Sequence, residues 1–176
     1  GLLTITNDIS AGTGNVYLTS GAGITEGTTK ITADTLGMIA AGAIDANSAT
    51  NNVVNMAAKT TVGAITYQDA DGFAIATVAP FGNFAGANGI NAGAGTANVT
   101  LTAGGVVTQA GATSNILAAG LEVQGTGSFA LTGGGNSVIT LAGNTKGSVV
   151  YTASNSIIIG KVTTAGLTSQ GDAIRA

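Results

Sequence analysis

Short runs in which aliphatic or β-branched residues alternate with polar residues recur along the whole chain. Residues 16–19, 99–102 and 138–141 are examples. This period of two is typical of strands with one buried face. Segments rich in Gly, Asn, Asp and Ser, such as residues 12–15, separate the runs and suit tight turns. The pattern therefore predicts many short strands joined by turns.

The predicted strands are spread evenly, and no window has the period and caps of a helix. Residues 38–46 are the best helix candidate, but Gly42 interrupts them and we expect no helix there. The strands are expected to start near Val16, Ile31, Val53, Ile65, Ile75, Val99, Ile116, Phe129, Val138, Val149 and Ile157.

The chain contains an internal repeat. Residues 98–104 align with residues 15–21 at an offset of 83, and Leu121 aligns with Leu36 at 85. Nine further pairs share an offset of 84: Asn136/Asn52, Val138/Val54, Ala142/Ala58, Gly147/Gly63, Val149/Ile65, Tyr151/Tyr67, Ile157/Phe73, Ile159/Ile75 and Val162/Val78. The sequence thus holds two copies of a unit of about 84 residues, approximately 1–90 and 91–176, with a long insertion around residues 83–97.

A unit of this length is too long for one turn of a solenoid. With two or three strands to a coil, it makes about four coils of about 20 residues, hence about eight coils stacked at ~4.8 Å into a rod of roughly 40 Å. We predict one all-β, right-handed parallel β-helix (β-solenoid) over residues 1–176, right-handed because parallel crossovers almost always are. Tyr67 and Tyr151 are expected at equivalent coil corners, four coils apart.

Composition narrows the possible functions. Only 7% of residues are charged and the net charge is −3, so a basic stripe for nucleic acid is not expected. No apolar run approaches the roughly 18 residues of a membrane span. The chain has no His and no Cys, which removes the common catalytic triads and zinc sites. We therefore expect no enzyme activity, no catalytic residues and no cofactor or metal. The alternative is a β-helical carbohydrate-binding, carbohydrate-processing or ice-binding protein.

Two motifs are compatible with ligands. Asp69-Ala70-Asp71-Gly72 resembles the start of a calcium loop, but residues 153–156, its counterpart, lack both carboxylates. A solvated turn is favoured, and calcium stays open. Tyr67 and Tyr151 share one repeat position and could stack on a sugar, although a structural role is favoured.

Threonine and asparagine also recur. Thr4-Ile5-Thr6 and Thr100-Leu101-Thr102 fit an ice-binding array, yet the repeat partner of Thr100 is Tyr17, so no flat array is expected. Asn98-Val99-Thr100 is formally a glycosylation sequon. Hydrogen-bonded Asn ladders between coils are the simpler account of the recurring asparagines, which are Asn15, Asn52, Asn98 and Asn136.

Residues 98–109, NVTLTAGGVVTQ, are similar to the NVTLTAGG-IT-Q runs of filamentous-haemagglutinin-like exoproteins. Residues 147–162 resemble their G--YT-AN-LTIGTV runs, and residues 65–78 are a looser copy. The resemblance implies the β-helical shaft of a two-partner-secretion passenger, exported through an outer-membrane barrel to the bacterial surface. It implies roles in adhesion or biofilm cohesion, with host or cell-surface glycans as potential partners.

Both ends of the sequence suggest continuation. Residues 1–6 open directly in a strand-like run, and residues 171–176 resemble the start of another coil. We expect this segment to belong to a longer chain or, as the alternative, to stack end to end with further copies into a filament. Unpaired strand edges favour such association, so the isolated segment is expected to form fibres.

Overall fold

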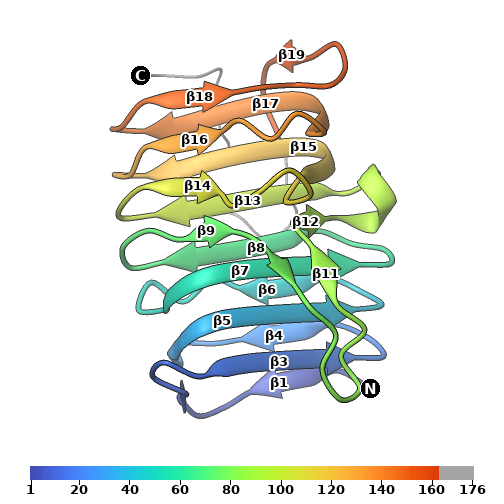
Figure 1. Cartoon of the computed structure of the whole chain (residues 1–176), viewed down its shortest axis with the longest axis vertical. Helices are drawn as coiled ribbons and strands as arrows, with labels where there is room; N and C mark the ends of the chain where they lie inside the picture. The colour runs from blue at the N-terminus through green and yellow to red at the C-terminus, as the bar shows by residue number, and fades with distance from the viewer. Residues whose placement is uncertain (163–176) are drawn as a thin grey trace.

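The chain winds through about eight stacked coils that form a parallel β-solenoid (Figure 1). The computed structural model describes residues 1–162. Residues 171–176, expected to begin another coil, lie outside this range. Helix within the described residues is limited to the 3-10 turn Gly93–Gly95, and residues 38–46 form strand, turn and strand. The predicted all-β solenoid is confirmed.

The strands are short, and every start expected from the sequence falls within one residue of an observed start. Their bounds are β1 Leu3–Ile5, β2 Ile9–Ser10, β3 Asn15–Ser20, β4 Ile24–Glu26, β5 Ile31–Ala40, β6 Ile44–Ala46, β7 Asn52–Thr60, β8 Ile65–Asp69, β9 Ala74–Ile75, β10 Thr77–Val78, β11 Ala87–Asn88, β12 Ile90–Asn91, β13 Asn98–Ala103, β14 Val107–Gln109, β15 Ile116–Gly125, β16 Phe129–Leu131, β17 Ser137–Thr145, β18 Val149–Tyr151 and β19 Ile158–Ile159. The short strands β2, β4, β6, β10, β11, β12 and β14 are absent from the expected starts.

One wall of the solenoid, wall A, is continuous from the first coil to the last. It consists of β1, β4, β6, β8, β13, the second halves of β15 and β17, and β19, each paired in parallel with the next. A ladder of inward aliphatic side chains runs along it. Its six central members are at most 2% exposed. The ladder is Leu3, Ile24, Ile44, Ile65, Val99, Leu121, Leu141 and Ile159.

The long strands bend and supply the other two walls of the first copy. In β5 the buried residues fall on odd positions up to Ala33 and, apart from Gly37, on even positions from Leu36. This change of phase marks a corner, because two successive outward residues turn the strand. In β7 the corner lies at Val54 and Asn55. We call the half before the corner wall B and the half after it wall C.

The second copy is rotated about the solenoid axis by one wall. Its long strand β15 begins on β12, which stacks on Ala58 and Lys59 of wall C. After its corner, β15 continues on β13, in wall A. The short strands β14, β16 and β18 stack through β9 on Asn55 and Met56 of β7. Long strands thus occupy walls B and C in the first copy and walls C and A in the second.

This rotation overturns the expected placement of the two tyrosines. Tyr67 lies in β8 on wall A, whereas Tyr151 lies in β18 and stacks on Leu131. The two residues are therefore on unlike walls. Sequence alignment relates positions of the unit, but it carries no information on how the second unit is oriented on the first.

The repeat register is also corrected. Val138 is fully buried, as is Val53, whereas Val54, its expected counterpart, is 55% exposed. β7 and β17 therefore correspond at an offset of 85, and one residue is lost in the turn that follows β17. A shift by one residue exchanges the two faces of a strand, so the slip matters.

A β-hairpin forms a strap, residues 77–88, inserted in wall C between β9 and β12 (Figure 1). The Gly89 N–H donates to the Ala76 oxygen at 2.9 Å and closes its base. The strap folds back across the outer faces of β7, β5 and β3, where Phe84 packs over Gly37. A Cβ on Gly37 would lie 2.6 Å from Phe84 Cζ, so any larger residue would have to displace the ring of Phe84. The insertion therefore begins at residue 77, earlier than the expected residues 83–97.

Candidate functional site

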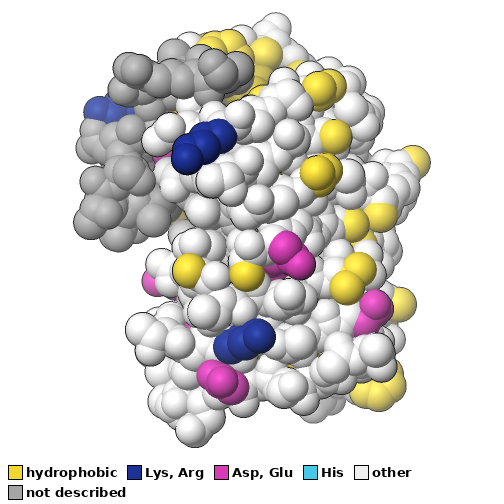
Figure 2. Space-filling view, turned by 90° about the vertical axis from the view of Figure 1, so that its left-hand side faces the viewer, with side chains coloured by type: hydrophobic (Ala, Val, Ile, Leu, Met, Phe, Trp, Pro, Cys, Tyr) yellow, Lys and Arg dark blue, Asp and Glu magenta, His cyan; other side chains and the backbone are white. Residues whose placement is uncertain are grey.

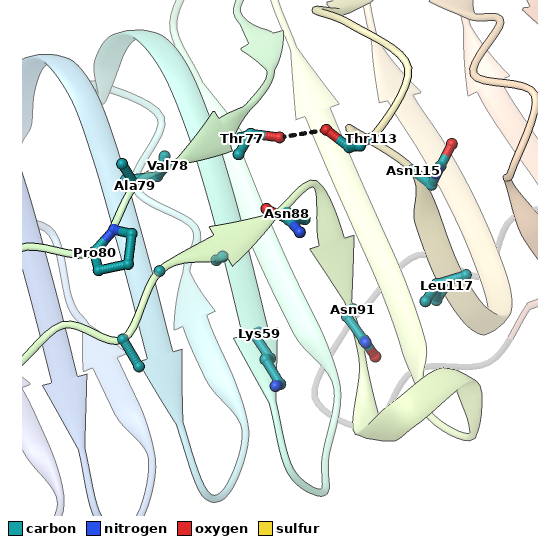
Figure 3. Close-up of a pocket in the computed structure, with 13 residues that line it drawn as sticks. Lys59, Thr77, Val78, Ala79, Pro80, Asn88, Asn91, Thr113, Asn115 and Leu117 are labelled. Carbon is teal, nitrogen blue, oxygen red and sulfur yellow. Dashed lines mark hydrogen bonds between the residues drawn. The ribbon is translucent and has the colours of Figure 1, made fainter.

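An open groove of about 720 Å³ lies beside the strap. The strap forms one side, the outer face of wall C forms the floor, and the loop before β15 forms the other side (Figure 3). A hydrogen bond of 2.9 Å joins the hydroxyls of Thr77 and Thr113 across it. The groove forms because the strap projects from wall C opposite the loop that precedes β15.

The floor of the groove is a row of outward side chains on three successive strands. Lys59 of β7 pairs with Asn91 of β12, which pairs with Leu117 of β15. The Oδ1 atom of Asn91 is buried and accepts no hydrogen bond from the described residues. Asn88 adds an exposed amide from the strap. No acidic side chain lines the groove. Sequence reasoning missed this site because its floor comes from strands in both copies.

The two acids of the calcium-like motif do not converge on one point. Asp69 points inward and is 2% exposed. Its Oδ2 accepts hydrogen bonds from the Tyr67 hydroxyl at 2.7 Å and the Val53 N–H at 3.1 Å. Asp71 is exposed and accepts the Gly72 N–H at 2.8 Å. This arrangement is a hydrogen-bonded turn. Burial raises the pKa of Asp69 to about 7, and the neighbouring Asp71 adds to the effect.

The tyrosines lie in the interior. Tyr67 is fully buried and packs edge-on against Phe73, with ring centroids 5.0 Å apart. The Tyr151 hydroxyl is buried without a partner among the described residues, and burial raises the pKa of Tyr151 to about 12. These positions do not form surface platforms for a sugar.

The four recurring asparagines do not form a ladder. In register, Asn15 pairs with Thr35, Asn52 with Thr32 and Asn98 with Gly120. Each therefore meets another residue type on the neighbouring coil with which it pairs. Of the four, only Asn136 is buried, at 0% exposure. Its side-chain amide binds backbone groups of both neighbouring coils.

Among the described residues, threonines stack on wall A only in pairs of neighbouring coils. Thr100 stacks between Thr66 and Glu122 on wall A, and Tyr17 is not its neighbour. Asp45 lies between Thr25 and Thr66. Thr100 is fully buried, so these threonines do not form a flat, exposed ice-binding array.

An interior clasp appears once in each copy and was not anticipated. In the first copy, Asn51 Nδ2 donates to Glu26 Oε2 at 2.8 Å, and the Ser48 N–H donates to the same oxygen at 3.3 Å. In the second, Gln109 and Asn136 exchange two hydrogen bonds of 2.7 and 3.0 Å. Asn51 and Asn136 each also accept an N–H from the preceding coil, from Ile31 and Ile116 at 2.8 Å.

Searches of protein-family models, curated proteins and solved structures found no match to this chain. Within residues 1–162, no three His, Cys, Asp or Glu side chains gather where they could hold a metal ion. No helix among these residues has the length and apolar character needed to cross a membrane.

Proposed function

We propose that this chain is part of the structural shaft of a secreted bacterial surface adhesin or extracellular filament that acts in adhesion or biofilm cohesion. The observation that carries the proposal is the aliphatic ladder of wall A, which has a member in every coil. Such a ladder joins each coil to the next and makes a stiff rod, since stability in a solenoid comes from interfaces between neighbours.

The character of the surface supports this role. Charged side chains are few and scattered on the face shown in Figure 2. Solubility must then come from Thr, Ser, Asn and backbone groups, a composition that suits a long extracellular rod better than a cytosolic enzyme. The motifs at residues 98–109 and 147–162 support export through an outer-membrane barrel, with further coils following in the same chain or by end-to-end stacking.

The proposal is tested on the full-length exported protein by deleting this segment and measuring rod length by negative-stain electron microscopy. About eight coils at ~4.8 Å predict a rod shorter by roughly 40 Å. An antibody against the segment should label intact cells. Unchanged rod length, or labelling only after the cells are permeabilised, would contradict the shaft role.

A further inference from the structure

We infer that the groove between the strap and wall C binds an acidic saccharide chain. The inference stands independently of the shaft role, because it rests only on the groove's side chains and shape. At about 720 Å³ the groove lies within the range of small-ligand sites, roughly 300–1,000 Å³, and can hold a few sugar rings.

The charge of the groove points to an anion. Lys59 is exposed on its floor, and no Asp or Glu lines it. The whole chain carries a net charge of −3, so this is a local reversal of sign. An ammonium group held among amides and aliphatic side chains is suited to a carboxylate, with which it forms a charge-assisted hydrogen bond.

The neutral polar groups point to hydroxyls as the ligand's other feature. Asn91 pairs with Lys59 in register, so the two side chains lie on adjacent strands (Figure 3). The exposed Asn88 amide offers both a donor and an acceptor from the strap, and Asn91 contributes a second, half-buried amide on the floor. Vicinal hydroxyl groups of a sugar donate and accept at once and match such amides.

The apolar side chains complete the match. Leu117 lies in the same row as Lys59 and Asn91, and Pro80 lines the strap side of the groove. They offer contacts to the C–H faces of sugar rings. The groove is also open, so a chain longer than the site can pass beyond it.

An extended peptide fits less well. Strands β7, β12 and β15, which form the floor, pair with one another on successive coils. The floor therefore offers no free strand edge to which a peptide could add by backbone hydrogen bonds.

The test uses isothermal titration calorimetry of the full chain with tetragalacturonate and with its fully methyl-esterified form, which has the same sugar rings and linkages without the charge. We expect saturable binding of the acid that weakens with salt, and binding of the ester at least about tenfold weaker. Lys59→Gln and Asn88→Asp should each weaken binding of the acid about tenfold or more, because hydrogen bonds to charged groups contribute about that much.

Lys30→Gln is the matched control: it removes the same charge from an exposed lysine that is not in the groove and should leave binding unchanged. Both groove residues are exposed, so the variants should fold, and circular dichroism verifies it. The inference is overturned if the acid does not bind, if acid and ester bind equally, or if Lys30→Gln and Lys59→Gln weaken binding equally.

Discussion

The two copies of the repeat close the same interior corner with different chemistry. Gln109 in the second copy corresponds to Glu26 in the first, and Asn136 corresponds to Asn51. Even the third partner matches, since the Gly133 N–H donates to Gln109 Oε1 at 2.7 Å as the Ser48 N–H does to Glu26. One backbone arrangement therefore accepts either a carboxyl or an amide.

The amide satisfies this corner more completely. Gln109 Nε2 donates to the Ser114 oxygen at 2.6 Å as well as to Asn136. In the first copy, Glu26 Oε1 is buried and has no partner among the described residues. Burial raises the pKa of Glu26 above its ordinary value despite the hydrogen bonds from Asn51 and Ser48, which lower it. We conclude that the second clasp stabilises its corner more than the first.

The largest expected effect comes from removing the clasp asparagine. Asn136→Ala leaves the Ile116 N–H and the oxygens of Leu131 and Thr152 without this partner in the interior. We expect a loss of about 3 to 5 kcal/mol in the free energy of unfolding, measured with urea, because each such group costs about 1 to 3 kcal/mol.

Asn51→Ala should cost less than Asn136→Ala, because Asn51 has fewer close partners. Asn144→Ala, at an exposed position, is the control and should change stability by less than about 0.5 kcal/mol. Equal losses for Asn51→Ala and Asn136→Ala would contradict the ranking of the two clasps.

Gln109→Glu transplants the first clasp into the second copy. The new carboxylate oxygen would face two acceptors, the Ser114 oxygen and Asn136 Oδ1. We expect a loss of about 2 to 4 kcal/mol at pH 8, because one oxygen of the partly buried carboxylate then lacks donors, and a smaller loss at pH 4, where the carboxyl can be protonated. Thermal unfolding at both pH values measures this, and equal losses would argue against the mechanism.

Glu26→Gln is the reverse exchange and should stabilise the chain by about 1 kcal/mol at pH 8. A carboxyl whose pKa is raised in the folded state loses stability as pH rises and it ionises, whereas glutamine does not. The gain should therefore shrink towards pH 4. A variant that is less stable than the parent at pH 8 would show that the Glu26 carboxylate is better solvated than its burial suggests.

Asp69→Asn should act mainly on the pH dependence of stability. The counterpart of Asp69 in the second copy is Ala153, so this acid is peculiar to the first. Its pKa rises from 3.8 to about 7 on folding, so stability should fall as pH rises between these values and be constant above them. The free energy of unfolding, measured with urea from pH 4 to 8, should fall less steeply with pH for Asp69→Asn than for the parent. An equally steep fall would show that other groups cause the pH dependence.

The strands and the solenoid were predictable because alternation over a few residues is a local signal. The orientation of the second copy on the first was not predictable. No pattern within one unit indicates that Val99 of the second copy stacks on Ile65 of the first. The groove depends on that orientation, because Lys59 and Leu117 come from different copies. The clasps escaped notice because a buried Gln or Glu looks, in sequence, like any polar residue beside a turn.

The second copy is rotated by one wall about the solenoid axis relative to the first, so successive units follow a helical path along the rod. In the first copy, the turn after the long strand β7 joins wall C to wall A at residues 60–65. In the second copy, the equivalent turn after β17 begins on wall A and leads away from it at residues 145–149. If a third unit obeyed the same rule, three units, roughly 250 residues and about twelve coils or 60 Å, would bring a given turn back to its starting side. A loop at a given position of the unit would then point in three different directions in three successive units. A flat surface lying along the rod would contact that loop only in every third unit.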